Sequence, residues 1–288
     1  MMKVYPECAQ CLLRRIMYET ELGGADMMQQ YAAMKLAIDA LHRDFSPEIC
    51  SAEIATGVHK GVYELLGKDP YADAKRKSNE ISLRLLPKAS KMVEESENPF
   101  KTAVLCSIIG NVLDFGIRND FANADVLLEK FDSLCEEGLG HDDTDDMREL
   151  ASGKVVYLTD NCGEIVFDRL LLEQLRKMGA KITLVVRGEP ILTDATMEDV
   201  RELGMGNLAD KVMSTEIFAV GIPFWDMPEE LDRELRSADL IIAKGMANYE
   251  TLSETDYGPI AYLLRTKCRP VASSMGLKKD INAAKLYR

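Results

Sequence analysis

The sequence lacks any apolar run as long as a membrane-spanning helix requires. Such a helix takes roughly 20 consecutive apolar residues, and no stretch of these 288 residues approaches that length. The first residues, Met1 to Cys8, also lack the apolar core of a secretory signal peptide. We therefore expect a soluble, cytoplasmic protein with no membrane partner.

The chain is also poor in positive charge relative to negative charge. It has 35 Lys and Arg residues against 48 Asp and Glu residues, which gives a formal net charge of −13. An acidic chain of this kind argues against a nucleic acid held by general electrostatics. An anionic substrate would need local help from a metal ion or from a few well-placed cations.

Cysteine and histidine are scarce and scattered. The seven cysteines are an odd number in a chain expected to be cytoplasmic, which favours thiols or metal ligands over a disulfide framework. Cys8 and Cys11 form one C-x-x-C pair, but a structural zinc site usually takes four ligands. A zinc or second metal site, a redox role, and buried or spare thiols all stay open for this pair. The histidines, His42, His59 and His141, are interpreted as structural or exposed.

Residues 1–150 carry a repeating helical pattern. Apolar residues recur at spacings of three and four, and helices are expected over Cys8–Leu22, Asp26–Leu41, Ser46–Leu66, Tyr71–Glu95 and Pro99–Ile117. The last stretch is apolar nearly all round, which is typical of a buried helix. We expect an all-helical N-terminal subdomain over residues 1–150, with an acidic surface connection at residues 136–146.

From Lys154 onward, apolar runs with strand character alternate with helical patterns. Strands are expected at Val155–Leu158, Ile182–Val186, Val212–Ser214, Leu240–Ala243 and Pro270–Ser273, and helices at Ile165–Met178, Met197–Leu203 and Pro228–Ser237. Ile260–Arg265 fits either a strand or a helix. Alternation of this kind predicts an α/β fold with a doubly wound, mostly parallel sheet between two helical layers. Residues 151–288 would form this Rossmann-like subdomain and carry the functional site.

Polar residues and glycines follow three of the expected strands. They are Asp160, Asn161 and Gly163 after the first strand, Asp194 after the second, and Lys244, Gly245 and Asn248 after Leu240–Ala243. Parallel strands place their carboxyl ends along one edge of the sheet, where ligands of α/β proteins bind. We therefore expect these residues to lie close together.

This set of residues has the chemistry of a metal-assisted phosphate site. The carboxylates of Asp160 and Asp194 and the amide oxygen of Asn161 suit Mg²⁺ or Mn²⁺. Lys244 would be a point charge for a phosphate group. Gly163 and Gly245 would let backbone N–H groups approach closely. Each residue alone also has a simpler interpretation, since Asp and Asn favour helix N-caps and Lys244 with Gly245 could form a plain strand exit.

Five segments together resemble the damage-control phosphatases, a family long catalogued as domain-of-unknown-function family eighty-nine. The segments are Asp160–Asp168, Thr193–Asp199, Lys244–Glu250, the Gly-Asn-x-x-Asp pattern of Gly110–Asp114, and the cysteines of Cys8–Cys11. The cysteine pair resembles the stand-alone branch of that family found in archaea and other microbes. The resemblance covers nearly the whole chain.

The resemblance implies a helical region packed on an α/β domain with the active site between them. It also implies hydrolysis of phosphate monoesters, of sugar phosphates or damaged phosphometabolites, with magnesium, manganese, cobalt or nickel as the divalent metal. Matched by motif, the metal ligands would be Asp160, Asn161 and Asp194, Lys244 would contact the phosphoryl group, and Asn111 and Asp114 would line the substrate pocket. Direct attack by water is favoured over an aspartyl-phosphate intermediate, because Asp160 would be occupied on the metal.

One segment departs from the family pattern. Other branches carry Arg-Thr-x-Lys near the C-terminus, whereas Arg265-Thr266-Lys267-Cys268 is one residue tighter here. Whether Lys267 is a second phosphate contact is therefore left open.

Two other classes of function remain as alternatives. One is a nucleotide-binding transferase or oxidoreductase, although Gly204-Met205-Gly206-Asn207-Leu208-Ala209 follows a helical stretch rather than the strand that a dinucleotide motif needs. The other is a non-catalytic metal-binding scaffold built around Cys8 and Cys11. Neither the oligomeric state nor the physiological substrate is predicted from the sequence.

Overall fold

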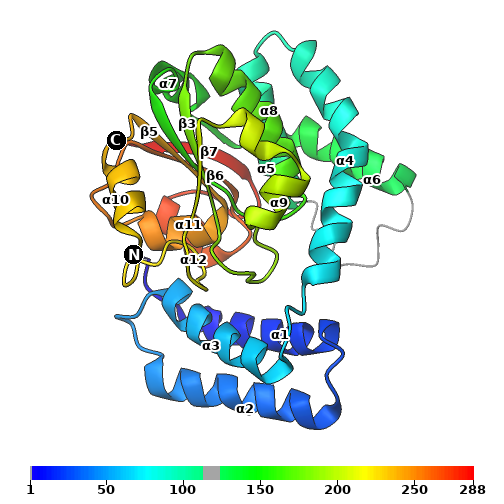
Figure 1. Ribbon diagram of the computed structural model, residues 1–288, viewed down its shortest axis with the longest axis vertical. Coiled ribbons are helices and arrows are strands. Elements are labelled where there is room, and N and C mark those ends of the chain that lie inside the picture. The colour runs from blue at the N-terminus through cyan, green and yellow to red at the C-terminus, as the bar shows by residue number, and fades with distance from the viewer. Residues whose placement is uncertain (1, 113–123) are drawn as a thin grey trace.

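The computed structural model describes residues 2–112 and 124–288, which form a seven-stranded sheet with helices on both faces and a three-helix unit beyond one end of the strands (Figure 1). The strands are β1 (His141–Asp142), β2 (Lys154–Leu158), β3 (Lys181–Val186), β4 (Lys211–Ser214), β5 (Leu240–Lys244), β6 (Ile260–Arg265) and β7 (Asn282–Tyr287). Their order is β1-β7-β6-β5-β2-β3-β4, and only the β6–β7 pair is antiparallel. The predicted α/β fold with a mostly parallel sheet is confirmed.

Strand β2 lies inside the sheet, between β5 and β3, and pairs in parallel with both. Leu158, the last residue of β2, is opposite Val185 of β3 and Ala243 of β5. The carboxyl ends of these three strands are therefore level with one another. Side chains that follow the strands are brought to one edge of the sheet, as a parallel arrangement requires.

The sheet separates two hydrophobic layers. One face is covered by α4 (Ala72–Glu94), α5 (Pro99–Val112), α6 (Ala124–Glu137), α7 (Thr144–Leu150), α8 (Glu164–Lys177) and α9 (Met197–Glu202), and the other by α10 (Glu229–Arg236), α11 (Gly245–Leu252) and α12 (Arg269–Met275). Residues of β2 alternate between the layers, with Val155 and Tyr157 in the first and Val156 and Leu158 in the second. Burial on both faces explains why the central strands are continuous apolar runs.

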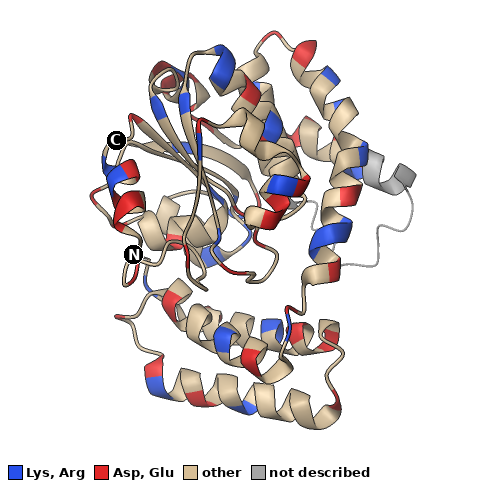
Figure 2. Ribbon diagram, viewed as in Figure 1, with Lys and Arg blue, Asp and Glu red and all other residues tan. Residues whose placement is uncertain are grey.

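Helix α5 lies between the sheet and its neighbouring helices, as its apolar sequence predicts. Ala103, Val104, Ile108 and Ile109 have no exposed surface. Gly110 lets α5 approach α8 closely, because a Cβ atom there would lie 2.9 Å from the Cα of Glu164. The outer helices differ from α5, and Figure 2 shows acidic and basic residues mixed along α2 and α4.

The three-helix unit consists of α1 (Pro6–Leu22), α2 (Met27–Asp44) and α3 (Ser51–Leu66). It has a small core of its own, formed by Leu12, Ile16, Ala33, Ala37, Ala40, Val58 and Val62. A second small apolar cluster joins the start of α3 to the loops of the α/β part, where Cys50 and Ala52 pack with Ile191, Phe218 and Val220. Across residues 2–112 and 124–288, none of the helices combines the length and the apolar character that crossing a bilayer demands.

The structure corrects two details of the expected elements and decides a third that the sequence left open. Pro270–Ser273 is not a strand but part of α12, and proline fits there because the first turn of a helix needs no N–H from it. Ile260–Arg265, which the sequence left open, is strand β6. The acidic stretch at residues 136–146 is more than a connection, since His141 and Asp142 pair with β7 and α7 begins at Thr144.

Candidate active site

Two loops are joined by main-chain contacts at the carboxyl edge of β2 and β3. Asp160 and Asn161 follow β2, and Asp194 lies in the loop that follows β3. The N–H of Ala195 donates to the carbonyl oxygen of Asp160 at 2.8 Å, and Asn161 forms an isolated antiparallel bridge with Asp194. The main chain therefore brings together the three residues that the sequence predicted as metal ligands.

The side chains of these loops are held by short hydrogen bonds. Oδ2 of Asp160 accepts from Nδ2 of Asn111 and from Nδ2 of Asn161, each at 2.6 Å. The hydroxyl of Thr193 donates to Oδ1 of Asn161 at 2.6 Å. Because Asn111 is at the end of α5, the helical layer also takes part in positioning Asp160.

Gly245 makes room for Asp160 at the start of α11. It has a φ of +73°, and a Cβ atom at this position would lie 1.9 Å from Oδ2 of Asp160. Only glycine can combine this backbone conformation with so close an approach. Gly245 was predicted to let a backbone N–H group approach a phosphate group, which stays a prediction. The geometry shows a different use of this glycine, which is to leave room for the carboxylate of Asp160.

Asp160, Asn161 and Asp194 line a cavity of about 190 Å³. Its walls include Asn111, Asp160, Asn161, Cys162, Thr193, Asp194 and Lys267, together with Arg15 from α1 and Ser78 from α4. Five of the residues predicted for the site thus meet at one cavity. Asp114, which was predicted to line the same pocket, is outside the described residues.

Lys244 is in a different place from the one that its predicted role suggests. Its ammonium group is fully buried and donates to Oε1 of Glu164 at 2.5 Å, to Oδ1 of Asp168 at 2.6 Å and to the carbonyl oxygen of Ser107 at 3.1 Å. Burial opposes its charge, but the two carboxylates outweigh burial and raise the pKa of Lys244. All three of its protons are donated within the protein, and Lys244 does not line the cavity.

Asn248 is likewise buried behind the cavity wall. Its Nδ2 donates to the carbonyl oxygens of Thr159 and Lys244, and its Oδ1 accepts from Arg187 at 3.0 Å. Arg187 in turn donates from Nε to Oδ2 of Asp194 at 2.5 Å. Asn248 therefore supports Asp194 through Arg187, and it does not line the cavity.

Three charged residues of the site were not singled out from the sequence. Glu164 has no exposed surface, and its Oε2 accepts from Nδ2 of Asn111 at 2.5 Å. Asp168 is one helical turn further along α8 and is bonded to Lys244, and Arg187 is bonded to Asp194. The four-residue spacing of Glu164 and Asp168 directly after Asn161 was an available signal, because it puts both carboxylates on one face of the helix.

The carboxylates of the cavity crowd one another. Burial is the main cause that raises the pKa of Asp160 well above its usual range, and the charges of Glu164 and Asp194 raise it further. Burial also raises the pKa of Asp194, against the opposing charge of Arg187. Buried carboxylates are costly in the charged form unless a cation compensates them.

The donor atoms fit a hard divalent cation. Two carboxylates and an amide oxygen are ligands that Mg²⁺ and Mn²⁺ prefer, and an amide oxygen can accept more than one partner. In residues 2–112 and 124–288, no group of three or more His, Cys, Asp or Glu side chains is arranged to hold a metal ion. A metal at this site would therefore depend on Asn161 as well as on Asp160 and Asp194, and no such group is formed around Cys8 and Cys11.

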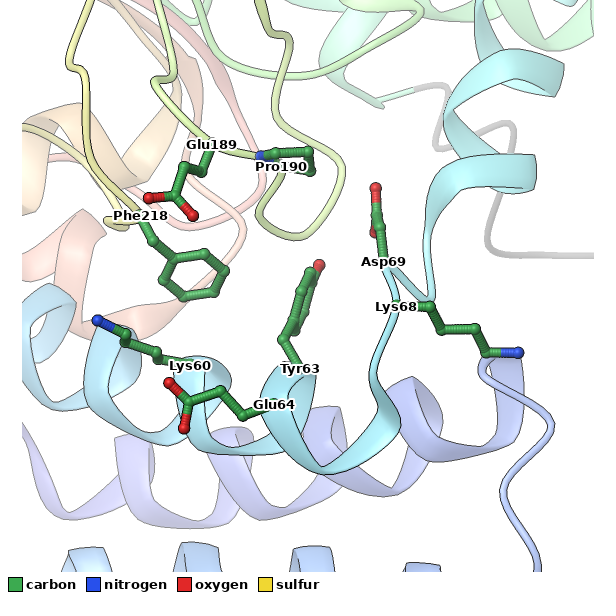
Figure 3. A pocket seen from close by; sticks show the side chains of 8 residues that line it. All are labelled: Lys60, Tyr63, Glu64, Lys68, Asp69, Glu189, Pro190 and Phe218. Carbon is green, nitrogen blue, oxygen red and sulfur yellow. The ribbon is translucent and has the colours of Figure 1, made fainter.

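A second hollow, of about 300 Å³, lies where α3 meets the loop that leads to Asp194 (Figure 3). Tyr63 and Phe218 line it, with ring centroids 5.2 Å apart in an edge-to-face arrangement. The hydroxyl of Tyr63 points toward this loop and accepts from the N–H of Leu192 at 2.8 Å. The three-helix unit thus braces the loop two residues before Asp194.

The comparisons with known proteins give consistent results. The family model of the damage-control phosphatase ARMT1-like domain matches residues 4–282. A protein of Archaeoglobus fulgidus named damage-control phosphatase is 43% identical over 288 residues, 99% of each chain. A damage-control phosphatase of Pyrococcus horikoshii is 33% identical over 282 residues, 96% of each chain. The crystal structure of a DUF89 family protein from Pyrococcus horikoshii superposes with a TM-score of 0.91 at 31% identity, over all of both chains.

Proposed function

The chain belongs to the damage-control phosphatase ARMT1-like family, and from that premise we propose that it is a divalent-metal-dependent phosphatase that hydrolyses phosphate monoesters of small metabolites. Sugar phosphates and damaged phosphometabolites are the proposed substrate classes. The observation that carries the proposal is the convergence of Asp160, Asn161 and Asp194 on one small cavity.

We assign the residues of the cavity as follows. Asp160, Asn161 and Asp194 would hold the metal, which when bound would polarise a phosphoryl oxygen and activate water. Asn111 orients the carboxylate of Asp160. Lys267, whose Nζ donates to the carbonyl oxygen of Asn111 at 2.6 Å, brings a positive charge to the same wall and would bind the phosphoryl group.

Glu164, Asp168 and Lys244 form a buried ionic group behind that wall. Glu164 contacts both Asn111 and Lys244, so the group fixes the residue that orients Asp160. We therefore propose that Lys244 acts by positioning Glu164. Direct attack by water remains the proposed route, because Asp160 would be occupied on the metal.

The dinucleotide alternative has less support. The segment that resembles a glycine-rich motif begins at Gly204, directly after α9, and continues as a 3-10 helix over Met205–Leu208. A dinucleotide motif instead needs a strand before it and a long helix after it. The scaffold alternative rests on Cys8 and Cys11, and the described part of the chain does not complete a metal site with them.

Phosphate release from chelated protein resupplied with Mg²⁺, Mn²⁺, Co²⁺, Ni²⁺ or Zn²⁺ tests the proposal. The assay uses several sugar phosphates and an aryl phosphate. Asp160→Asn should lower metal-restored release by at least about 100-fold, since ligand loss weakens both metal binding and catalysis. Asp226→Asn, at an exposed position outside the cavity, is the matched control and should keep full release.

Two results would count against the proposal. One is the absence of release with every metal from a protein that is folded by circular dichroism. The other is full metal-stimulated release by the Asp160→Asn variant.

A further inference from the structure

Two cationic side chains line the cavity, and they come from different parts of the molecule. Lys267 follows β6 in the α/β part, whereas Arg15 is on α1. Among the described residues that line the cavity, Arg15 is the one contributed by the three-helix unit. The role of Arg15 is therefore separate from the pattern of strand ends that builds the rest of the site.

The two cations act on different neighbours. Lys267 is close to the proposed metal ligands, because its Nζ donates to the carbonyl oxygen of Asn111 and Nδ2 of Asn111 donates to Oδ2 of Asp160, each at 2.6 Å. The charge of Arg15 opposes the rise in the pKa of Tyr71 that burial causes. Tyr71 caps the start of α4 and packs against Tyr18 of α1, with ring centroids 6.4 Å apart. Arg15 is thus on the wall formed by α1 and the start of α4.

A phosphate monoester has one end that is transferred and one that is not. The transferred end belongs with Asp160, Asp194 and Lys267, because the metal ligands are there. The rest of the substrate must then face other walls, of which Leu192, Met246 and Ala247 are apolar. A guanidinium group presents five N–H donors in a planar fork, which suits hydroxyl and carboxylate oxygens.

We propose that Arg15 is a selectivity residue that binds the oxygen-rich, non-transferred part of a phosphorylated metabolite. The inference rests on the proposed function and deepens it, since it gives the three-helix unit the task of substrate recognition. The cavity is small, at about 190 Å³, so the substrates would be small polyhydroxylated or carboxylated phosphate esters. A site that hydrogen-bonds its substrate strongly rejects analogues that lack the matching oxygen atoms.

The test compares two substrates in variants with a matched control. A hexose phosphate carries hydroxyl groups away from the phosphate, whereas p-nitrophenyl phosphate carries none. Arg15→Met should lower kcat/KM for the hexose phosphate by about 10- to 100-fold, the usual effect of losing hydrogen bonds from a charged group. The same variant should change kcat/KM for p-nitrophenyl phosphate by less than about 3-fold. Lys267→Met should lower both values, and Arg14→Met, at the exposed neighbouring position, should lower neither.

A structural role for Arg15 would give a different pattern. Equal losses on both substrates, or no loss on either, would overturn the proposal. Arg15→Lys provides a second variant in case Arg15→Met does not fold. Lysine keeps the charge but loses the planar fork, so the selectivity for the hexose phosphate should fall by about 5-fold or more.

Direct binding separates a failure of this inference from a failure of the proposed function. Calorimetry with the Mn²⁺-loaded protein would measure two ligands, inorganic phosphate and a hexose phosphonate, in which a C–P bond replaces the ester bond so that the ligand is not hydrolysed. Arg15→Met should weaken binding of the hexose phosphonate by about 10-fold and leave inorganic phosphate within about 2-fold. That result with no hydrolysis by the wild-type protein would sink the phosphatase and keep the role of Arg15. Equal weakening, or no binding of either ligand, would overturn the role of Arg15.

Discussion

A single glycine decides whether Asp160 can take its observed position. We expect Gly245→Ala to lower metal-stimulated phosphatase activity by at least about 100-fold, because the new Cβ atom would displace the Asp160 carboxylate. Gly276→Ala is the matched control, since Gly276 also has a positive φ, of +67°, but open space around its Cβ position. Both variants should lose about 1 kcal/mol of stability from backbone strain. Urea unfolding and phosphate release check both expectations, and equal activity of the two variants would contradict the assignment.

Substitution of two lysines near the site should lower the free energy of unfolding by very different amounts. Lys244→Met should lower the free energy of unfolding by about 3–5 kcal/mol, because it leaves Glu164 and Asp168 buried without their cation. Lys267→Met should lower it by less than about 1 kcal/mol, since Lys267 is exposed. Urea denaturation of both variants provides the measurement. A Lys244→Met variant as stable as Lys267→Met would argue against the buried ionic group.

Residues that chemistry and strand order bring together could be predicted from the sequence. Asp160, Asn161 and Asp194 follow parallel strands, so their meeting point was a consequence of the fold. The different positions of Lys244 and Lys267 could not be predicted. Both are lysines near strand ends, and only the structure shows that Lys244 is paired with the buried carboxylates of α8 while Lys267 lines the cavity. An isolated sequence contains no signal for that difference.

One carboxylate of helix α10, that of Glu234, contacts three strands. It forms ion pairs with Lys154 on β2 and Lys211 on β4, each at 2.9 Å, and accepts a hydrogen bond from the hydroxyl of Thr183 on β3 at 3.1 Å. Burial alone would raise the pKa of Glu234, but these bonds outweigh it and lower the pKa to about 2. The stabilisation is therefore present above the ordinary pKa of glutamate, near 4.3, and is lost as the pH falls toward 2.

The Glu234→Gln variant makes this pH dependence measurable. At pH 7 it should be less stable than the wild type by about 1–2 kcal/mol, a value reduced for solvent screening. The difference should shrink between pH 4.5 and pH 3, because Glu234 of the unfolded wild-type chain takes up a proton in this range while the folded protein keeps the carboxylate charged. Glu230→Gln, at a more exposed partner of Lys211, should cost less than about 0.5 kcal/mol at any pH. A difference for Glu234→Gln that is constant from pH 7 to pH 3 would contradict the lowered pKa.

Helices and strands with a regular pattern of apolar residues could be predicted from the sequence, whereas short segments that mix polar and apolar residues could not. Helices α1–α5 and strands β2, β3 and β5 follow from apolar spacing. The segment around Pro270 was misassigned because four small or apolar residues have no distinct period. Strand β7, at Asn282–Tyr287, was not predicted at all. It is antiparallel to β6 and contains Lys285, so it lacks the continuous apolar run of the buried parallel strands.

At the scale of the whole molecule, the cavity belongs to both parts of the chain. The metal ligands come from the sheet edge, Asn111 from α5, and Arg15 from the three-helix unit. Tyr63 and the apolar cluster around Phe218 hold the three-helix unit against the Asp194 loop. A site assembled in this way ties substrate recognition to the docking of the helices. It also concentrates negative charge at the centre of the molecule, where that charge opposes folding.

The buried negative charge of Asp160 should lower the stability of the metal-free protein, although the proposed metal binding requires it. With a chelator present, Asp160→Asn should be more stable than the wild type at pH 8, because burial and the neighbouring carboxylates raise the pKa of Asp160 and make its charged form costly. Because the folded-state pKa of Asp160 is raised, the wild-type penalty is absent below about pH 4 and grows as the pH rises. Saturating Mn²⁺ should reverse the order, since metal at about 100 times its Kd adds about 2.7 kcal/mol to a protein that binds it. Thermal unfolding from pH 5 to pH 8, with and without Mn²⁺, measures both effects. If Asp160→Asn is less stable than the wild type at pH 8 with a chelator present, the protein neighbours of Asp160 alone stabilise its charged form. That result would remove the electrostatic argument for a metal ion at this site.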